Sequence, residues 1–358
     1  MPRPPACCDH RRVPGYALLL LPSANRVYTE AAGSIARAEL RVLGQTVLGG
    51  RVGEIAETVI GGVRYVTFEA EPLDAGQIAF LSVLSSGYAL FERAGGLMRP
   101  VCLQPRAAYD DDLLTIQKYP GKTNEQFTRL LLNVTVLSSA FGPELLSRQL
   151  TVLDPLCGRG TTLNQALMYG YDAAGIDIDR QDFDAYRAFI RTWLQRKRLK
   201  HHVDYDGPVR RNGKVVARRL QLSMAAGKDA WQAGAAQSLD LVNADTIRAA
   251  EFFRPASAHV LVTDAPYGVQ HGSRAGGKGL ARAPLDLLTN AVPVWASLLR
   301  PGGAIGIAWN TLVARREDAA QILADAGLEP MSEPPYLGFR HRVDQSIVRD
   351  VLIARKPG

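Results

Sequence analysis

Cysteine and long apolar runs are both scarce in this sequence. Neither the spacing of a disulfide framework nor that of a zinc site fits its four cysteines, Cys7, Cys8, Cys102 and Cys157. We therefore expect reduced thiols and a cytoplasmic location. No apolar run approaches the roughly 20 residues of a membrane span, so we expect no membrane partner. The short run Tyr16–Leu21 ends at Pro22 and predicts a buried strand rather than a signal peptide.

Acidic residues are outnumbered by basic ones, which gives a formal net charge of +7 and favours an anionic polymer as partner. Basic residues are densest in residues 195–222, around an Asn-Gly pair typical of a hairpin turn. We predict an inserted basic hairpin with these phosphate-binding candidates: Arg196, Lys197, Arg198, Lys200, Arg210 and Arg211. The alternative is a solvated loop that tolerates sequence change.

The length of 358 residues allows two domains. Residues 1–14 are rich in Pro and Arg and predict a disordered tail. In residues 15–100 the pattern is β-α-β-β-α-β, with a hairpin turn at Gly61-Gly62, which predicts a ferredoxin-like domain. We expect this domain to bind substrate, and the alternative is a domain that serves only as a scaffold. Residues 101–122 have the character of a linker.

Residues 123–358 predict an α/β domain with a Rossmann-like, mostly parallel sheet, because strands and helices alternate from Thr151 onward. The expected strands are 151–153, 173–177, 239–243, 259–263, 304–309 and 347–354. Ahead of them, Thr123 and Gln126 have the spacing of a capping box that would open a helix over 127–140.

The first chemical motif is Asp154-Pro-Leu-Cys-Gly158-Arg-Gly160-Thr, where a strand passes through a glycine turn into a helix. Glycines let the backbone approach a ligand closely, and the exposed N–H groups at the helix start attract a polar group. Ligands of open α/β sheets bind at this carboxyl edge. The third glycine of a dinucleotide fingerprint is absent, since Leu163 occupies its position.

Two further acids follow the next strands. Asp177 lies about 20 residues beyond the glycine turn, the spacing of an acid that accepts ribose hydroxyls. Asp245 follows the third strand and is a candidate acceptor for an adenine amine. Either acid alone could be a helix cap. Together with the glycine turn, the acids at three successive strand ends predict an adenosine pocket.

The fourth motif, Asp264-Ala265-Pro266-Tyr267-Gly268, follows an apolar strand. An exocyclic amine of a nucleobase is a poor nucleophile because its lone pair is delocalised. Asp264 and the Ala265 carbonyl can accept its protons, and Pro266 restrains that carbonyl. Tyr267 offers a ring on which the base can stack. This motif predicts a site that holds a base amine for reaction.

The four motifs resemble those of S-adenosylmethionine-dependent methyltransferases that modify exocyclic amines of nucleobases. They are most similar to the THUMP-associated tRNA guanine-N2 methyltransferase group. The resemblance implies a class I methyltransferase domain and S-adenosylmethionine as cofactor. It places Asp154, Gly158 and Gly160 at the methionine end of the donor, Asp177 at its ribose, Asp245 at its adenine, and Asp264, Pro266 and Tyr267 at the target base. This sequence departs from the family pattern in two ways. The last motif usually has the form D-P-P-Y, and here Ala265 stands in place of the first proline. The N-terminal part is also short for a full THUMP module.

The expected function is methyl transfer to a nucleobase amine in RNA, with guanine in tRNA as the leading substrate. One alternative is a DNA adenine or cytosine amino-methyltransferase with the same motif logic. Another is a non-catalytic RNA-binding factor that retains the fold.

Overall fold

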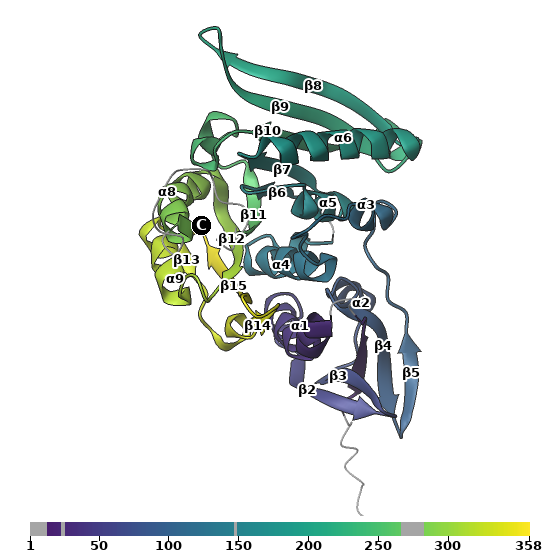
Figure 1. Ribbon diagram of the computed structural model, residues 1–358. Helices are drawn as coiled ribbons and strands as arrows, with labels where there is room; N and C mark the ends of the chain where they lie inside the picture. Colours follow the sequence, from purple (N-terminus) through teal and green to yellow (C-terminus); the bar gives the residue numbers. More distant parts are fainter. Residues whose placement is uncertain (1–12, 23–25, 147–148, 266–282) are drawn as a thin grey trace, which may run out of the picture.

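The computed structural model describes residues 13–22, 26–146, 149–265 and 283–358. It contains two β-sheets with helices packed on and between them (Figure 1). None of the described helices has the length and apolar character that crossing a membrane requires.

The N-terminal unit is a five-stranded antiparallel sheet in the order β2-β3-β1-β4-β5. Its elements are β1 (Gly15–Leu20), α1 (Arg26–Thr46), β2 (Val52–Ile60), β3 (Val63–Ala70), α2 (Ala75–Leu81), β4 (Gly87–Ala94) and β5 (Leu97–Val101). The order β-α-β-β-α-β agrees with the prediction, and β5 is an addition that the sequence pattern did not reveal. The hairpin between β2 and β3 turns at Gly61 and Gly62, whose φ angles are both positive at +57° and +81°.

The larger sheet has the order β13-β15-β12-β11-β6-β7-β10-β9-β8. Its five parallel strands are β6 (Thr151–Asp154), β7 (Asp172–Asp177), β10 (Gln237–Asn243), β11 (Ala258–Asp264) and β12 (Leu299–Asn310). The C-terminal strand β15 (Val348–Arg355) is antiparallel to β12 and also pairs with the two-residue strands β13 (Glu329–Pro330) and β14 (His341–Arg342). The predicted parallel strands are therefore present, within a sheet that is mixed as a whole.

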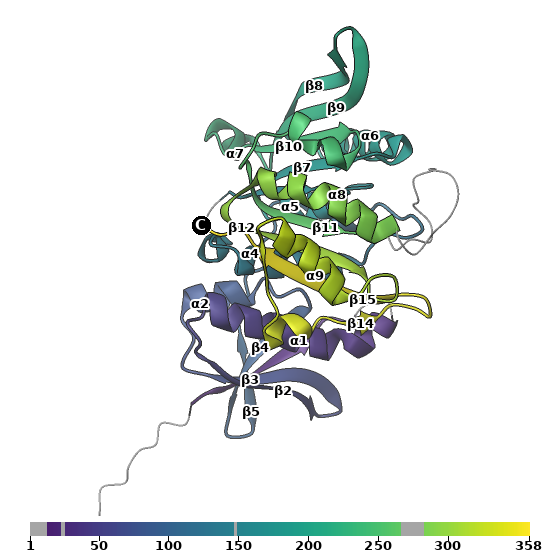
Figure 2. The ribbon, with the colours of Figure 1, turned by 90° about the vertical axis from the view of Figure 1, so that its left-hand side faces the viewer.

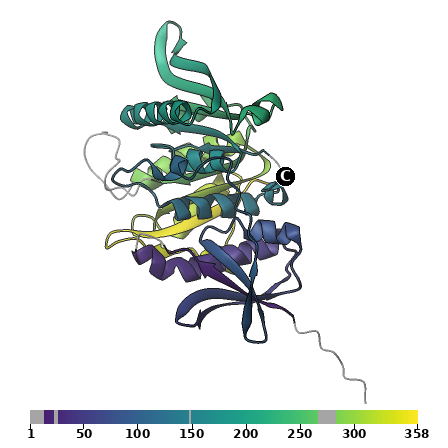
Figure 3. The same ribbon diagram turned by 90° about the vertical axis from the view of Figure 1, so that its right-hand side faces the viewer.

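Helices cover both faces of the central strands of this sheet, which is why β11 is buried along almost its whole length. One face carries α4 (Glu125–Ser138), α5 (Thr161–Met168) and α6 (Arg180–Arg196), which lie toward the viewer in Figure 3. The other carries α8 (Ala283–Leu298) and α9 (Arg316–Asp325), seen in Figure 2. Short helices complete the structure: α3 (Asp112–Thr115), α7 (Lys228–Gln232), η1 (Gly142–Glu144), η2 (Thr246–Glu251) and η3 (Pro334–Leu337).

The two sheets share one hydrophobic core, because α1 packs against α4 and continues the apolar layer of the larger sheet. A buried polar network joins the two parts at this contact. The Glu39 carboxylate of α1 accepts from Asn133 Nδ2 of α4 at 2.8 Å and from Ser85 Oγ at 2.6 Å. Tyr169 in turn donates to Asn133 Oδ1 at 2.8 Å. The N-terminal unit is thereby held against the larger sheet by hydrogen bonds as well as apolar packing.

The predicted basic hairpin is confirmed as β8 (Lys200–Arg211) and β9 (Lys214–Ala225). It turns at Asn212 and Gly213, with φ of +49° and +76°. Because β9 pairs with β10, the hairpin extends the large sheet rather than forming a loose loop (Figure 1). Arg187 and Arg191 of α6 fasten it by binding the Asp206 carboxylate of β8 at 2.7 and 2.6 Å.

Candidate functional site

The glycine turn leads from β6 into α5. Gly158 and Gly160 both have positive φ, +47° and +77°, and the Gly160 N–H donates to the Cys157 carbonyl at 2.8 Å. A Cβ on Gly160 would lie 2.4 Å from the ring of Tyr186, which is fully buried. The turn therefore requires glycine at residue 160 for two reasons, its backbone conformation and the space taken by Tyr186.

Asp177, at the end of β7, binds this turn directly. One of its carboxylate oxygens accepts from Gly158 N at 2.7 Å, and the other accepts from Asp179 N at 2.8 Å. Burial raises the pKa of the Asp177 carboxyl, and these two N–H groups offset part of that rise. The Asp177 carboxylate is thus oriented by the glycine turn.

Asp154, at the end of β6, is 3% exposed. Burial raises its pKa to about 7, although its Oδ1 accepts from Leu156 N at 3.1 Å. A buried carboxyl near neutrality ionises readily when a cation arrives beside it. This suits a group that would face the ammonium of an amino acid.

Asp245 follows β10 and caps η2, since its carboxylate accepts from Ile247 N at 3.1 Å. Asp245 is therefore a helix cap, which was the alternative to a ligand-binding role. It also lies at the same edge of the sheet as the other acids. The strand order β10-β7-β6-β11 puts Asp245, Asp177, Asp154 and Asp264 in one row at the carboxyl edge. With neighbouring strands about 4.8 Å apart, Asp177 and Asp264 are two strands, or roughly 10 Å, apart.

Asp264 ends β11 and is contacted by two side chains from distant parts of the sequence. Thr123 Oγ1 donates to Asp264 Oδ2 at 2.6 Å, and Arg349 Nη2 lies 3.5 Å from the same oxygen. Ala265 is buried and its N–H donates to the Ala308 carbonyl at 2.8 Å. The predicted target-base residues Pro266 and Tyr267 lie outside the described residues.

The predicted linker 101–122 contributes to the site, which sequence reasoning missed. Tyr119 forms a hydrogen bond with Thr161 Oγ1 at 2.9 Å, at the first residue of α5. The Arg159 guanidinium lies 4.9 Å from the centre of the Tyr119 ring, and its Nε donates to Asp182 at 2.7 Å. We call residues 117–123 the strap, because they cross from the glycine turn to Asp264.

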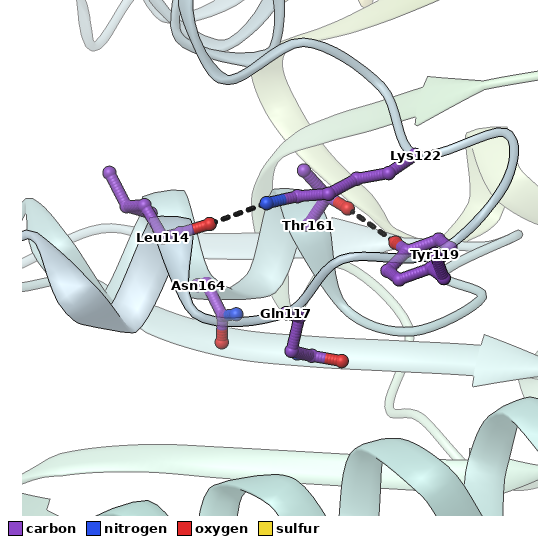
Figure 4. A pocket seen from close by; sticks show the side chains of 6 residues that line it. All are labelled: Leu114, Gln117, Tyr119, Lys122, Thr161 and Asn164. Carbon is purple, nitrogen blue, oxygen red and sulfur yellow. Dashed lines mark hydrogen bonds between the residues drawn. The ribbon is translucent and has the colours of Figure 1, made fainter.

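Figure 4 shows the inner side of the strap. Lys122 Nζ donates to the Leu114 carbonyl at 2.7 Å, and a cavity of about 10 Å³ remains between the strap and α5. That volume is close to a single water molecule, so the strap is packed against the helix. The predicted capping box at Thr123 is wrong by one residue. Asn124 caps α4 by accepting from Gln126 N and Phe127 N, which leaves the Thr123 hydroxyl to bind Asp264.

The basic candidates fall into two groups at opposite edges of the sheet. Strand β8 runs parallel to β10, so its last residues, Arg210 and Arg211, lie at the carboxyl edge. The residues before and at its start lie at the amino edge: Arg196, Lys197, Arg198 and Lys200. Lys197 also binds Asp110 and Asp112, at 2.8 and 2.6 Å. Arg211 binds Glu251 through its carboxylate and its carbonyl. The carboxyl-edge group gains two residues that were not among the candidates, Lys214 and Arg218.

No cluster of His, Cys, Asp or Glu suited to a metal ion occurs in the part of the chain that the structure describes. The site therefore consists of a glycine turn, a row of acids and the strap.

No protein-family model matches the sequence, and no curated protein matches it either. Solved structures similar to this chain include three methyltransferases. The 1,6-didemethyltoxoflavin N1-methyltransferase of Burkholderia thailandensis, solved with S-adenosylhomocysteine, is 14% identical, with 66% of this chain and 80% of that chain covered and a TM-score of 0.38. A SAM-dependent methyltransferase of Methanosarcina mazei is 15% identical, with coverages of 60% and 95% and a TM-score of 0.34. An rRNA methylase of Streptococcus thermophilus is 11% identical, with coverages of 67% and 100% and a TM-score of 0.35.

Proposed function

We propose that this chain transfers a methyl group from S-adenosylmethionine to an exocyclic amine of a nucleobase in RNA, with guanine in tRNA as the leading substrate. The observation that carries the proposal is the row Asp245, Asp177, Asp154 and Asp264 at four adjacent strand ends. The first three, with the glycine turn, have the chemistry to bind adenine, ribose and the methionine ammonium. The fourth has the chemistry to bind a base amine.

The strand order supports a class I methyltransferase fold. Five parallel strands in the order β10-β7-β6-β11-β12 are followed by the antiparallel β15, and the glycine turn follows the central strand β6. In such sheets the strand order reverses beside the first strand, which creates the crevice for the ligand. The N-terminal unit, with its order β2-β3-β1-β4, is in this proposal a ferredoxin-like domain that binds substrate in the cytoplasm.

In the proposed reaction, S-adenosylmethionine supplies a methyl group bonded to a positively charged sulfur. The amine nitrogen bonds to the methyl carbon as the carbon–sulfur bond breaks, and the bonding pair stays on sulfur. Asp264 accepts a hydrogen bond from the amine, which directs the nitrogen lone pair toward the methyl group. The nitrogen, positive after transfer, then releases a proton to water. Alignment of the amine with the donor accounts for most of the barrier lowering in this scheme.

The hairpin supports a polymeric substrate. Its carboxyl-edge residues Arg210, Lys214 and Arg218 have no carboxylate partner among the described residues. Lys214 and Arg218 lie on β9, four strands from β11, and Arg210 lies on β8, five strands away. These cations are therefore roughly 19 to 24 Å from Asp264 along the edge. A single nucleoside at Asp264 cannot reach them, whereas the phosphates of an RNA that places one base at Asp264 can.

Transfer of tritiated methyl groups tests the proposal. Purified protein is incubated with labelled S-adenosylmethionine and total RNA from cells that lack its gene, with DNA from the same cells as the second acceptor. We expect label in RNA that is lost on ribonuclease treatment, and an at least 100-fold loss in Asp264→Asn with donor affinity within about threefold of wild type. Label in DNA alone would support the DNA methyltransferase alternative. Donor binding without transfer to either acceptor would support the non-catalytic alternative. Concurrent loss of donor binding in Asp264→Asn would assign that residue to the donor site or to folding.

A further inference from the structure

The Asp264 carboxylate has one oxygen, Oδ2, that two side chains approach. Thr123 Oγ1 donates to it at 2.6 Å, and the guanidinium of Arg349 lies 3.5 Å away. Thr123 belongs to the strap and Arg349 to the last strand, so residues separated by more than 200 positions meet at this oxygen. Neither residue belongs to the four motifs that suggested the function.

The strand register explains how Arg349 reaches this place. Asp264 of β11 pairs with Ala308 of β12, and Ala308 pairs with Val351 of β15. Side chains two residues apart on a strand share a face, so Arg349 is on the same face as Val351 and lies farther toward the carboxyl edge of β11. Its guanidinium thereby comes within 3.5 Å of Asp264 at the end of β11.

Both groups are themselves held in place. The Arg349 side chain is only 7% exposed, and its guanidinium lies 4.5 Å from the centre of the Phe127 ring in the first turn of α4. Thr123 precedes Asn124, whose side chain caps the same helix. The N-terminal turn of α4 thus positions the hydroxyl and provides the ring beneath the cation.

We propose that Thr123 and Arg349 are positioning residues that set the orientation of the Asp264 carboxylate for the base amine. The inference rests on the proposed function and deepens it. A hydrogen bond and a charge contact on one oxygen restrict rotation of the carboxylate about its Cβ–Cγ bond. An acceptor held in one plane directs the amine lone pair along one line, and a misplacement of about 1 Å can cost 100-fold in rate.

The strap gives this arrangement a second consequence. Tyr119, four residues before Thr123, forms a hydrogen bond with Thr161 at the start of α5. One short segment therefore contacts the glycine turn on the donor side and Asp264 on the amine side. It sets the position of the two reacting groups relative to each other.

Thr123→Val removes the hydroxyl and keeps the branched shape, whereas Thr123→Ser keeps the hydroxyl and removes a methyl group. We expect Thr123→Val to lower kcat for methyl transfer to the total RNA about 10- to 50-fold, with KM for RNA and donor affinity within about threefold of wild type. Thr123→Ser should recover kcat to within about threefold. A residue needed only for folding would lower donor affinity and the melting temperature in both variants.

Arg349→Lys is the second variant, and it retains the charge but not the planar geometry. We expect a kcat reduction with unchanged donor affinity. Wild-type kcat in Thr123→Val, or equal losses in Thr123→Val and Thr123→Ser, would overturn the inference. Neither result would affect the proposed function, which fails instead if Asp264→Asn retains full transfer to RNA or if the wild type has none.

Discussion

Neutralising the carboxyl-edge end of the hairpin should weaken RNA binding and its salt dependence together. The triple variant R210Q/K214Q/R218Q removes three cations that have no carboxylate partner among the described residues. Each phosphate contact of single-stranded RNA contributes about 0.7 to the slope of log K against log salt. Three contacts give a slope about 2 units smaller. The electrostatic contribution vanishes at about 1 M salt, where the triple variant and wild type should bind RNA equally well. At about 0.15 M salt the triple variant should therefore bind RNA roughly 50-fold more weakly than wild type.

The amino edge of the same hairpin offers a matched control. The control triple removes the same charge from exposed residues at the opposite edge: R196Q, R198Q and K200Q. Fluorescence anisotropy of labelled RNA, recorded from about 0.05 to 0.3 M salt, measures both affinity and slope. The control should retain a slope within about 0.5 of wild type. Equal losses in the two triples would mean that net charge, rather than a defined contact at the carboxyl edge, determines binding, and would refute the reasoning.

Two further predictions concern the donor side. Gly160→Ala should destabilise the fold by about 3 kcal/mol, since it combines positive φ with a Cβ clash against Tyr186. Gly234→Ala has a similar φ of +72° but open space, so it isolates the backbone cost of about 1 kcal/mol, and equal melting temperatures for the two would contradict the clash. Burial raises the pKa of Asp154 to about 7, so between about pH 4 and 7 the native state keeps a proton that the unfolded chain has lost. Stability should therefore fall by up to about 4 kcal/mol as pH rises through this window, and Asp154→Asn should lack this contribution. Parallel melting temperatures of wild type and Asp154→Asn across this pH range would count against it.

The parallel sheet was predictable because each of its strands is a local apolar run with a polar residue at its end. Asp154, Asp177 and Asp264 end β6, β7 and β11, and Asp245 lies two residues after the last residue of β10. The strand order places these four acids at one edge of the sheet. No single segment of the sequence specifies that order. The motif spacing identified the acids because a carboxyl edge is where parallel strands bring such residues together.

The strap and Arg349 could not be found in this way. Residues 117–123 have no periodicity, and their contacts with Thr161 and Asp264 are tertiary. Arg349 reaches Asp264 through the register of two intervening strand pairs, which depends on long-range pairing. The division of the basic candidates into two groups could not be predicted for a related reason: residues at the two ends of a 12-residue strand lie at opposite edges of the sheet.

Nucleoside mass spectrometry of RNA labelled by the purified protein tests the central claim most directly. The RNA comes from cells that lack the gene, and wild type is compared with Asp264→Asn. The account predicts a nucleoside methylated on an exocyclic amine, N2-methylguanosine in the leading case, which wild type forms and Asp264→Asn does not. A methyl group on ribose or on a ring carbon, or the same product from both proteins, would contradict the claim that Asp264 holds a base amine for methyl transfer.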